Sequence, residues 1–406
     1  MLVDNDRICK LFIVYDSEKN PLRSLISLVP SDETLLKAVL ALAAQHKANT
    51  GQQIFATPSG RLTDAHHHAL IFKHDAIHGL SQAVQHVDLC RQDSTVASIF
   101  LLIFLDLLES GSDRWNVHIE GAKNLIALLN QQTGYNPGQT VQEIRGFITK
   151  QIYLYADKLH TIFHCTANDA RIETLGATFV RPRLLSHVAP PDTLDQDAVE
   201  QSFLGCPGTL LSAIQYFSHL RDAIGGLEII DTTDPVITRQ IEDLTTTLDC
   251  IQTFDCQLWA SSLPHQHQSP TRNTDNLSAL SMSYKLGAQI YGQRVLDALT
   301  LETETATPQE TLVADLLRVI ASLHDDPFLF KCILWPICIA AVETPQDAHA
   351  QRCFVTECIE KFWTDTKCLN SLNAARIVQQ YWEREETQRS RWIFDMGFLG
   401  EDWLFI

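Results

Sequence analysis

The sequence predicts an all-α protein, a multi-helix bundle or α-solenoid-like arrangement, from three observations. Apolar residues recur at positions i, i+3, i+4 and i+7 through many segments, the period of a helix with one buried face. Glycine is sparse, with 17 in 406 residues, which argues against a turn-rich β architecture. The chain is 45% hydrophobic and 20% charged, so it can bury a large core.

Five helices are expected in the N-terminal half. The first follows Ser31, a plausible N-cap, and runs to about residue 49. The second spans about 63–87, and the third begins at Asp93-Ser94 and is apolar on both faces, so it should be central. The fourth begins at Asp113, and the fifth covers about 141–159. The apolar residues of the second helix are Ala69, Leu70, Ile77, Leu80 and Val84.

The C-terminal half is expected to be helical after an irregular stretch. Prolines and a lack of periodicity predict a surface loop at about 167–199, and a polar segment at 264–276 predicts another. Further helices are expected at 210–224, 234–258, 277–301, 309–323, 328–343, 347–364 and 370–388. The aromatic tail from Trp392 to Ile406 is too apolar to remain in solvent, so it should dock. The predicted organisation is an N-terminal segment (1–30), an N-terminal helical half (31–165), an irregular loop (166–200) and a C-terminal helical half of the same domain (201–406).

One segment, Trp115–Ala122, combines a helical stripe with an unfavourable glycine. The residues Trp115, His118, Ala122, Leu125 and Leu129 fall on one helix face. Gly121 lies inside this helix, where glycine costs about 1 kcal/mol relative to alanine. We therefore expect another backbone to approach closely at Gly121. His118 is expected to be a hydrogen-bonded core histidine rather than a metal ligand.

Charge, hydropathy and cysteine spacing argue against several classes of partner. The formal net charge is −18 and no run of consecutive basic residues occurs, so these 406 residues are not expected to bind DNA directly. The longest apolar runs, 99–105 and 332–342, are far shorter than the ~20 residues of a membrane span. Eleven cysteines include no C-x-x-C pair, which favours reduced, buried thiols in the cytosol or nucleus.

The histidines of the second helix are the first candidates for a metal site. His67 and His74 are two turns apart, about 10 Å along a helix axis, too far to share one ion. His74 and His78 could share one, but no cysteine or carboxylate is placed to complete the site. A polar helix face, which also includes His66 and His68, is therefore the preferred interpretation.

Two His-Asp dipeptides suggest an enzyme as an alternative. His74-Asp75 and His324-Asp325 are similar to part of the H…HD…D set of helical metal-dependent phosphohydrolases. His46, together with Asp106 or Asp113, could complete the first set. The G-x-S-x-G, P-loop and G-x-G-x-x-G motifs are absent. We predict no catalytic, cofactor-binding or metal-binding residue, no cofactor and no enzymatic activity. A helical metal-dependent enzyme acting on a phosphorylated or prenylated small molecule is the alternative.

Seven segments, in order, resemble the helical regulatory domain of fungal-specific transcription factors, which usually follows a binuclear zinc cluster. The resemblance covers about residues 15–406. The segments are Asn20-Pro21-Leu22-Arg23 with Leu35-Leu36 and Ala44-Gln45-His46, then Ala76–Leu80, the Trp115/His118/Gly121/Ala122 set, Phe203-Leu204-Gly205-Cys206-Pro207, Leu258-Trp259, Leu334-Trp335-Pro336-Ile337, and Trp392–Ile406 with Gly397 and Gly400.

The resemblance implies a nuclear regulator of fungal transcription, with control of a secondary-metabolite biosynthetic gene cluster as the more specific expectation. Family members typically read DNA through six N-terminal cysteines holding two zinc ions, but only Cys9 precedes the regulatory region here. Either the protein works without that cluster or an upstream exon is missing. The expected partners are the transcriptional machinery or a zinc-cluster transcription factor, whose sequestration is a third possibility. A homo- or heterodimer and a small-molecule effector are compatible with the resemblance, and no membrane contact is expected.

Overall fold

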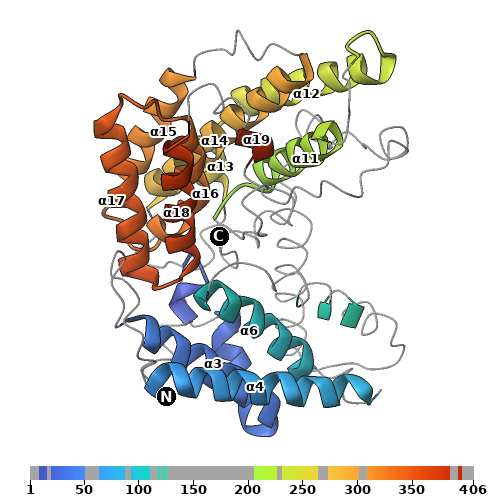
Figure 1. Cartoon of the computed structure of the whole chain (residues 1–406), viewed down its shortest axis with the longest axis vertical. Helices are drawn as coiled ribbons and strands as arrows, with labels where there is room; N and C mark the ends of the chain where they lie inside the picture. Colours follow the sequence, from blue (N-terminus) through green and yellow to red (C-terminus); the bar gives the residue numbers. More distant parts are fainter. Residues whose placement is uncertain are drawn as a thin grey trace. The chain divides into compact units, whose positions relative to one another are not determined.

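A computed structural model describes much of the chain and confirms the all-α prediction. The described residues are 9–15, 20–50, 64–86, 93–109, 118, 121–122, 124–125, 205–225, 231–263, 273–300, 309–384 and 392–395. Every regular element in these ranges is a helix (Figure 1). The chain divides into two compact units: Met1–Asp157 with Trp363–Asn373, and Lys158–Phe362 with Ala374–Ile406.

The first unit is built around three long helices. Its elements are α2 (Pro21–Leu25), the 3₁₀ helix η1 (Ile26–Ser31), α3 (Glu33–Thr50), α4 (Asp64–Gln85) and α6 (Asp93–Glu109). Helix α3 contacts both α4 and α6, and α6 is buried on all its faces, as its sequence predicted. Leu102 and Leu105 of α6 are 1% and 0% exposed.

A single carboxylate connects the beginnings of α3 and α6. Asp32 Oδ1 accepts a hydrogen bond from the backbone N–H of Leu35 at 2.9 Å, and Asp32 Oδ2 accepts one from Ser94 Oγ at 2.6 Å. The predicted N-cap of α3, Ser31, was therefore one residue too early. Its hydroxyl instead donates to the Leu28 carbonyl.

The apolar residues of helix α4 divide into a buried set and an exposed set. Ala69, Ala76 and Leu80 are buried, and Gly79 lies so close to α3 that an added Cβ would collide with the Thr34 hydroxyl. The other apolar residues named for this helix, Leu70, Ile77 and Val84, are 52%, 42% and 53% exposed. Leu70 and Ile77 directly follow the buried Ala69 and Ala76, so they lie about 100° around the helix axis from the face that packs on α3.

The second unit is also formed by helices throughout its described residues. They are α11 (Gly208–Gly225), α12 (Pro235–Thr253), α13 (Cys256–Ser262), α14 (Thr274–Thr300), α15 (Glu310–Ser322), η4 (Phe330–Cys332), α16 (Leu334–Glu343), α17 (His349–Thr366), α18 (Asn370–Trp382) and α19 (Trp392–Asp395). The last residues of α17 and the first of α18 belong to the first unit.

Helix α14 is the centre of the second unit. It contacts α11, α12, α13, α15, α16 and α19, and such crowding requires small residues on the helix. A Cβ at Gly287 would lie 2.8 Å from Trp335 Cζ3, and one at Gly292 would lie 2.6 Å from Phe217 Cε2 and 2.8 Å from Leu248 Cδ2. These two glycines therefore allow bulky side chains of α11, α12 and α16 to pack directly against the α14 backbone.

Two predicted helices are each divided in two. The segment 234–258 breaks at Phe254, because Asp255 begins a new helix by accepting a hydrogen bond from the Leu258 N–H at 2.8 Å. Asp234 caps α12 in a similar way, through the Val236 N–H. The segment 328–343 consists of η4 followed by α16. A capping side chain sets the boundary at Asp255, which apolar periodicity does not detect, whereas the predicted start at Asp234 agrees with its role as the N-cap of α12.

The close approach expected at Gly121 is contradicted. On the predicted stripe, Ala122 and Leu125 are buried, at 0% and 5% exposed, and His118 is half-buried. No described residue lies within 4 Å of a Cβ built on Gly121. Gly121 is only half-buried, whereas Gly79, Gly287 and Gly292 make the close approaches.

Several predictions fall outside the described residues. They are Trp115, Leu129, the helix at 141–159, the loop at 166–200, residues 264–272 of the second predicted loop and the last residues, 396–406. The predicted four-part organisation therefore stays a prediction. Docking of the aromatic tail is confirmed for its described part, since Trp392 and Ile393 are 2% and 3% exposed.

Most of the described cysteines are buried, as expected, but Cys353 is exposed and Cys250 is only partly buried. All nine described cysteines are free thiols, and burial raises the pKa of Cys332 and Cys338 to about 12. These two thiols therefore pack as small apolar groups. A search of the described helices finds none that is both long and apolar enough to cross a bilayer.

Replacing glycine by alanine is expected to change the free energy of unfolding in opposite directions at Gly292 and Gly121. Gly292→Ala should lower the free energy of unfolding by about 1–2 kcal/mol, because overpacking against Phe217 and Leu248 outweighs the gain in helix propensity. Gly121→Ala should be neutral or stabilising by up to about 1 kcal/mol. Chemical denaturation monitored by circular dichroism measures both. Equal destabilisation by the two variants would contradict this assignment of the glycines.

Candidate functional site

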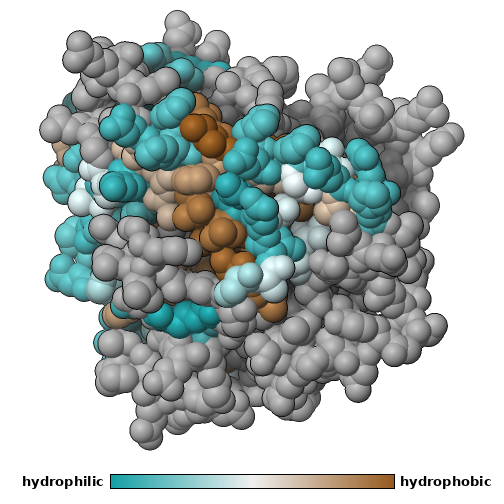
Figure 2. Space-filling view, turned by 90° about the horizontal axis from the view of Figure 1, so that it is seen from below, coloured by the Kyte–Doolittle hydropathy of each residue, from teal (hydrophilic) through white to brown (hydrophobic). Residues whose placement is uncertain are grey.

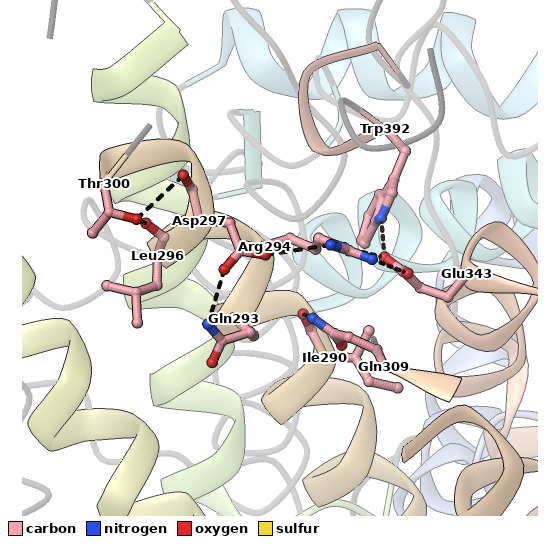
Figure 3. Close-up of polar contacts among 9 residues, drawn as sticks. All are labelled: Ile290, Gln293, Arg294, Leu296, Asp297, Thr300, Gln309, Glu343 and Trp392. Atoms are coloured by element: carbon pink, nitrogen blue, oxygen red, sulfur yellow. Dashed lines mark hydrogen bonds and ion pairs between the residues drawn. The ribbon is translucent and has the colours of Figure 1, made fainter. Parts of the chain in front are cut away.

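The second unit contains a buried ion pair that joins three helices (Figure 3). Arg294 of α14 donates to both carboxylate oxygens of Glu343 at the end of α16, with Nε–Oε1 and Nη2–Oε2 distances of 2.7 and 2.6 Å. The indole Nε1 of Trp392, in α19, donates to Glu343 Oε1 at 2.5 Å. The Arg294 and Glu343 side chains are 11% and 6% exposed, so this cluster is almost free of solvent.

Further polar contacts continue the cluster along α14. Asp297 Oδ2 lies 3.3 Å from Arg294 Nη1, and Asp297 Oδ1 accepts from Gln293 Nε2 at 2.9 Å. Gln309, which precedes α15, donates to the Ile290 carbonyl at 3.4 Å. Side chains or carbonyls from α14, α16, α19 and the start of α15 therefore meet within one polar region of the core (Figure 3).

The electrostatics of this cluster favour a fixed cation. Burial alone lowers the pKa of Arg294, but the hydrogen bonds and negative charge of Glu343, with a further contribution from Asp297, raise it above its usual value. The guanidinium therefore keeps its proton and cannot serve as a general acid or a general base. Chemically, the arrangement fixes the relative positions of helices and offers no reacting group.

A second charged cluster lies in the first unit, between α4 and α6. Lys73 Nζ forms an ion pair with Glu109 and lies 3.4 Å from Asp106 Oδ1. His118 Nε2 lies 3.5 Å from Asp106 Oδ2. Burial, aided by the nearby Lys73, lowers the pKa of His118 to about 4. The imidazole is therefore neutral at pH 7 and faces a buried carboxylate.

A third polar contact in the same unit involves Asn49, which is fully buried. Its amide nitrogen donates to the Leu108 carbonyl at 2.7 Å and to the Lys367 carbonyl at 2.8 Å. Its oxygen accepts from Gln45 Nε2 at 3.0 Å. Lys367 has a φ of 56° and follows the end of α17. The Asn49 side chain thus links α3 by hydrogen bonds to the end of α6 and to Lys367, the residue of left-handed conformation that follows α17.

The histidines considered as metal ligands lie on an exposed surface of α4. The His74 side chain is 80% exposed, and its ring stacks on that of His78 with centroids 6.3 Å apart. Among the described residues, no three His, Cys, Asp or Glu side chains are arranged to hold a metal ion.

The residues of the enzyme alternative are not brought together as a site. His46 is buried in α3, whereas His74 faces solvent. Asp106 is buried beside Lys73, and Asp113 lies outside the described residues. In the second dipeptide, His324 lies 3.2 Å from its neighbour Asp325, in an exposed position.

Comparison with known proteins identifies the family. Residues 5–405 match the family described as "Fungal specific transcription factor domain". The chain belongs to this family. It is also 25% identical over 405 residues to the acriflavine sensitivity control protein acr-2 of Neurospora crassa, covering 98% of this chain. The chain spans 63% of the length of that relative. No solved structure matches the present chain.

The segments that resemble the transcription factor domain form architectural contacts. Asn20 caps α2, with its side-chain oxygen accepting from the Leu22 N–H at 2.9 Å and its amide nitrogen donating to the Cys9 carbonyl. Gly205 has a φ of 58°, a left-handed conformation that favours glycine. Trp335 stacks on Tyr284, with ring centroids 5.6 Å apart. In this transcription factor domain the described family segments therefore position helices.

Sequence reasoning missed Arg294, Glu343, Lys73 and Glu109. Arg294 and Glu343 are 49 residues apart on different helices, and no local spacing links them. The only partial signal was the aromatic tail, which was expected to dock and which supplies Trp392.

Removing Glu343 should destabilise the second unit. In Glu343→Ala, Arg294 loses its bidentate partner while remaining almost buried, which should cost about 3–5 kcal/mol of unfolding free energy. The matched control is Asp315→Ala, which breaks the Asp315–Arg318 pair, 2.7 Å long but solvent-exposed, and should cost less than about 1 kcal/mol. Urea denaturation followed by tryptophan fluorescence compares the variants. Similar losses in both would refute the importance of the buried pair.

The lowered pKa of His118 predicts loss of stability on acidification. The folded state holds the His118 proton less tightly than the unfolded chain, whose histidines titrate near about pH 6.5. The unfolding free energy should therefore fall by about 1–3 kcal/mol as the pH drops from about 6.5 to 4. Burial raises the pKa of Glu109, and this opposes part of the fall.

The His118→Gln variant separates this contribution from that of other groups. It removes the titration at this position while keeping a polar side chain, so its unfolding free energy should depend less on pH between about 4 and 6.5. Denaturant titrations at a series of pH values measure the slope. An unchanged slope would show that His118 does not contribute.

Proposed function

We propose that this chain is the regulatory region of a fungal transcription regulator that acts in the nucleus through protein contacts. The observation that carries the proposal is the family match over residues 5–405, which covers both compact units. Its partners would be the transcriptional machinery or a zinc-cluster transcription factor. Control of a secondary-metabolite gene cluster is the more specific role we propose.

The charge of the chain supports action through proteins rather than through a nucleic-acid surface. A net charge of −18 repels a phosphate backbone, and favourable binding to DNA normally requires clustered Lys and Arg. The 406 residues therefore suit a role that follows recruitment to a promoter.

The buried polar clusters support a non-enzymatic role. Arg294 and Glu343 satisfy each other with two hydrogen bonds, and the His118 imidazole is directed at Asp106 from a half-buried position. Each cluster joins helices instead of presenting a nucleophile or a base to a cavity. We propose that the chain is a scaffold and not an enzyme.

A tethering experiment tests the transcriptional role. The full chain is fused to a heterologous DNA-binding domain and expressed in a filamentous fungus with a matching promoter and reporter gene. We expect reporter transcription to differ from that with the DNA-binding domain alone, and a fluorescent fusion to accumulate in the nucleus. Glu343→Ala should reduce the effect by unfolding the second unit, whereas Asp315→Ala should retain it.

Protein abundance is measured by immunoblot in the same strains. Reporter transcription equal to that of the DNA-binding domain alone, at equal abundance, would contradict a regulatory role. Transcript profiling after deletion of the gene then tests the narrower role. Unchanged expression of every secondary-metabolite cluster would remove that part of the proposal.

A further inference from the structure

Two histidines on the exposed side of α4 lie at the spacing of a metal-chelating pair. Figure 2 views the molecule from the side where Figure 1 draws α4, and hydrophilic residues reach that surface beside hydrophobic ones. His74 and His78 are both exposed, and they follow each other by about one helical turn. Side chains at this spacing are neighbours, with about 5–6 Å between their Cβ atoms. The two imidazoles can therefore reach one common ligand.

The two imidazole rings are already aligned with each other. Their centroids lie 6.3 Å apart, and their planes differ by 4°. The helix that carries them is anchored, because Ala76 is buried and Gly79 lies so close to α3 that an added Cβ would collide with Thr34. The backbone therefore holds the spacing of the pair, and only rotations of exposed side chains, which take nanoseconds or less, are needed to bring two ring nitrogens to one atom.

The hydrogen-bonding neighbours of the pair leave each ring with a nitrogen that can accept. The amide nitrogen of Gln82 lies 3.0 Å from His78 Nε2. An amide nitrogen only donates, so His78 Nε2 is the acceptor and offers a lone pair. Asp75 Oδ1 lies 3.5 Å from His74 Nδ1, where it favours a proton on Nδ1 and leaves Nε2 as the acceptor. A carboxylate beside the other ring nitrogen is a common companion of metal-binding histidines.

A pair of imidazole nitrogens selects the late transition metals of the first row. Imidazole suits Zn²⁺, Ni²⁺ and Cu²⁺, whereas Ca²⁺ and Mg²⁺ prefer oxygen ligands. Once one nitrogen has bound an ion, the second is held at a high effective concentration by the helix, so the pair acts as a chelate. The described residues supply no cluster of three His, Cys, Asp or Glu. Such a site would therefore keep open positions for water or for the Gln82 amide oxygen.

The charges around the pair are compatible with a bound cation. Lys73, the neighbour of His74 in sequence, forms an ion pair with Glu109 of α6. Lys37 of α3 lies 3.4 Å from Asp75. Both lysines therefore have their positive charge compensated by a carboxylate. The net charge of −18 adds a long-range potential that attracts cations to the chain.

We propose that His74 and His78 together bind one late transition-metal ion on the exposed side of α4. This site differs from the one considered in the sequence, which required a cysteine or carboxylate to complete it, because water fills the remaining positions of a two-ligand chelate. The ion has no catalytic role in the proposal. Metal binding by the purified chain does not depend on the transcriptional role, so either proposal can fail without the other.

Isothermal titration calorimetry of the full chain with NiCl₂ at neutral pH tests the proposal. We expect a binding step of one ion per chain, whose dissociation constant rises by about tenfold or more in His74→Gln and in His78→Gln, because each variant leaves a single imidazole. The matched control is His68→Gln, at an exposed histidine of the same helix that has Phe72 one turn further on, and it should leave the step unchanged. Circular dichroism confirms that all variants are folded.

The double variant His74→Gln/His78→Gln tests whether the two histidines share one ion. It should bind Ni²⁺ no more weakly than either single variant, since the loss of one ligand already removes the chelate, whereas two separate sites would give additive losses. Nickel bound by other histidines or thiols is common to all variants and cancels in the comparison. Unchanged binding in His74→Gln, additive losses in the double variant, an equal loss in His68→Gln, or one ion shared by two chains would each overturn the proposal.

Discussion

The architecture of the second unit depends on how closely side chains can approach the backbone of α14. This helix is surrounded by α11, α12, α13, α15, α16 and α19, which a helix of large residues could not accommodate at normal packing distances. Gly287 and Gly292 leave room for Trp335 and Phe217. Glycine weakens a helix in isolation, so the stability of α14 must come from burial and not from its intrinsic propensity.

Both units place charged groups inside an apolar core, and each does so where several helices meet. The Arg294–Glu343 pair engages Trp392, and Lys73 engages Asp106 and Glu109. Such pairs add little net stability compared with apolar residues of the same shape, but they penalise alternative arrangements that would leave a charge unpaired. Their contribution here is to specify which helix faces meet.

Helix positions were largely predictable because apolar residues recur at the helical period wherever one face of a helix is buried. The all-α class, α4, α6, α14 and α15 were all expected within a few residues. Boundaries at Asp32 and Asp255 were not, because they depend on individual side chains that accept backbone hydrogen bonds. The outward face of α4 was missed because periodicity alone cannot distinguish a face that meets the core from one that meets solvent. Gly121 was misread because a helical glycine reveals close packing only when its neighbours are known.

Asn49 has a consequence for the order in which the protein folds. Its amide bonds the carbonyl of Lys367, 318 residues further along the chain, and Trp363–Asn373 belongs to the same compact unit as the N-terminal helices. The first unit cannot complete its own core until most of the polypeptide has left the ribosome. Contacts of such large sequence separation slow folding, so the N-terminal helices spend much of synthesis without their last partner. During that interval they are held by the contacts that α3 makes with α4 and α6.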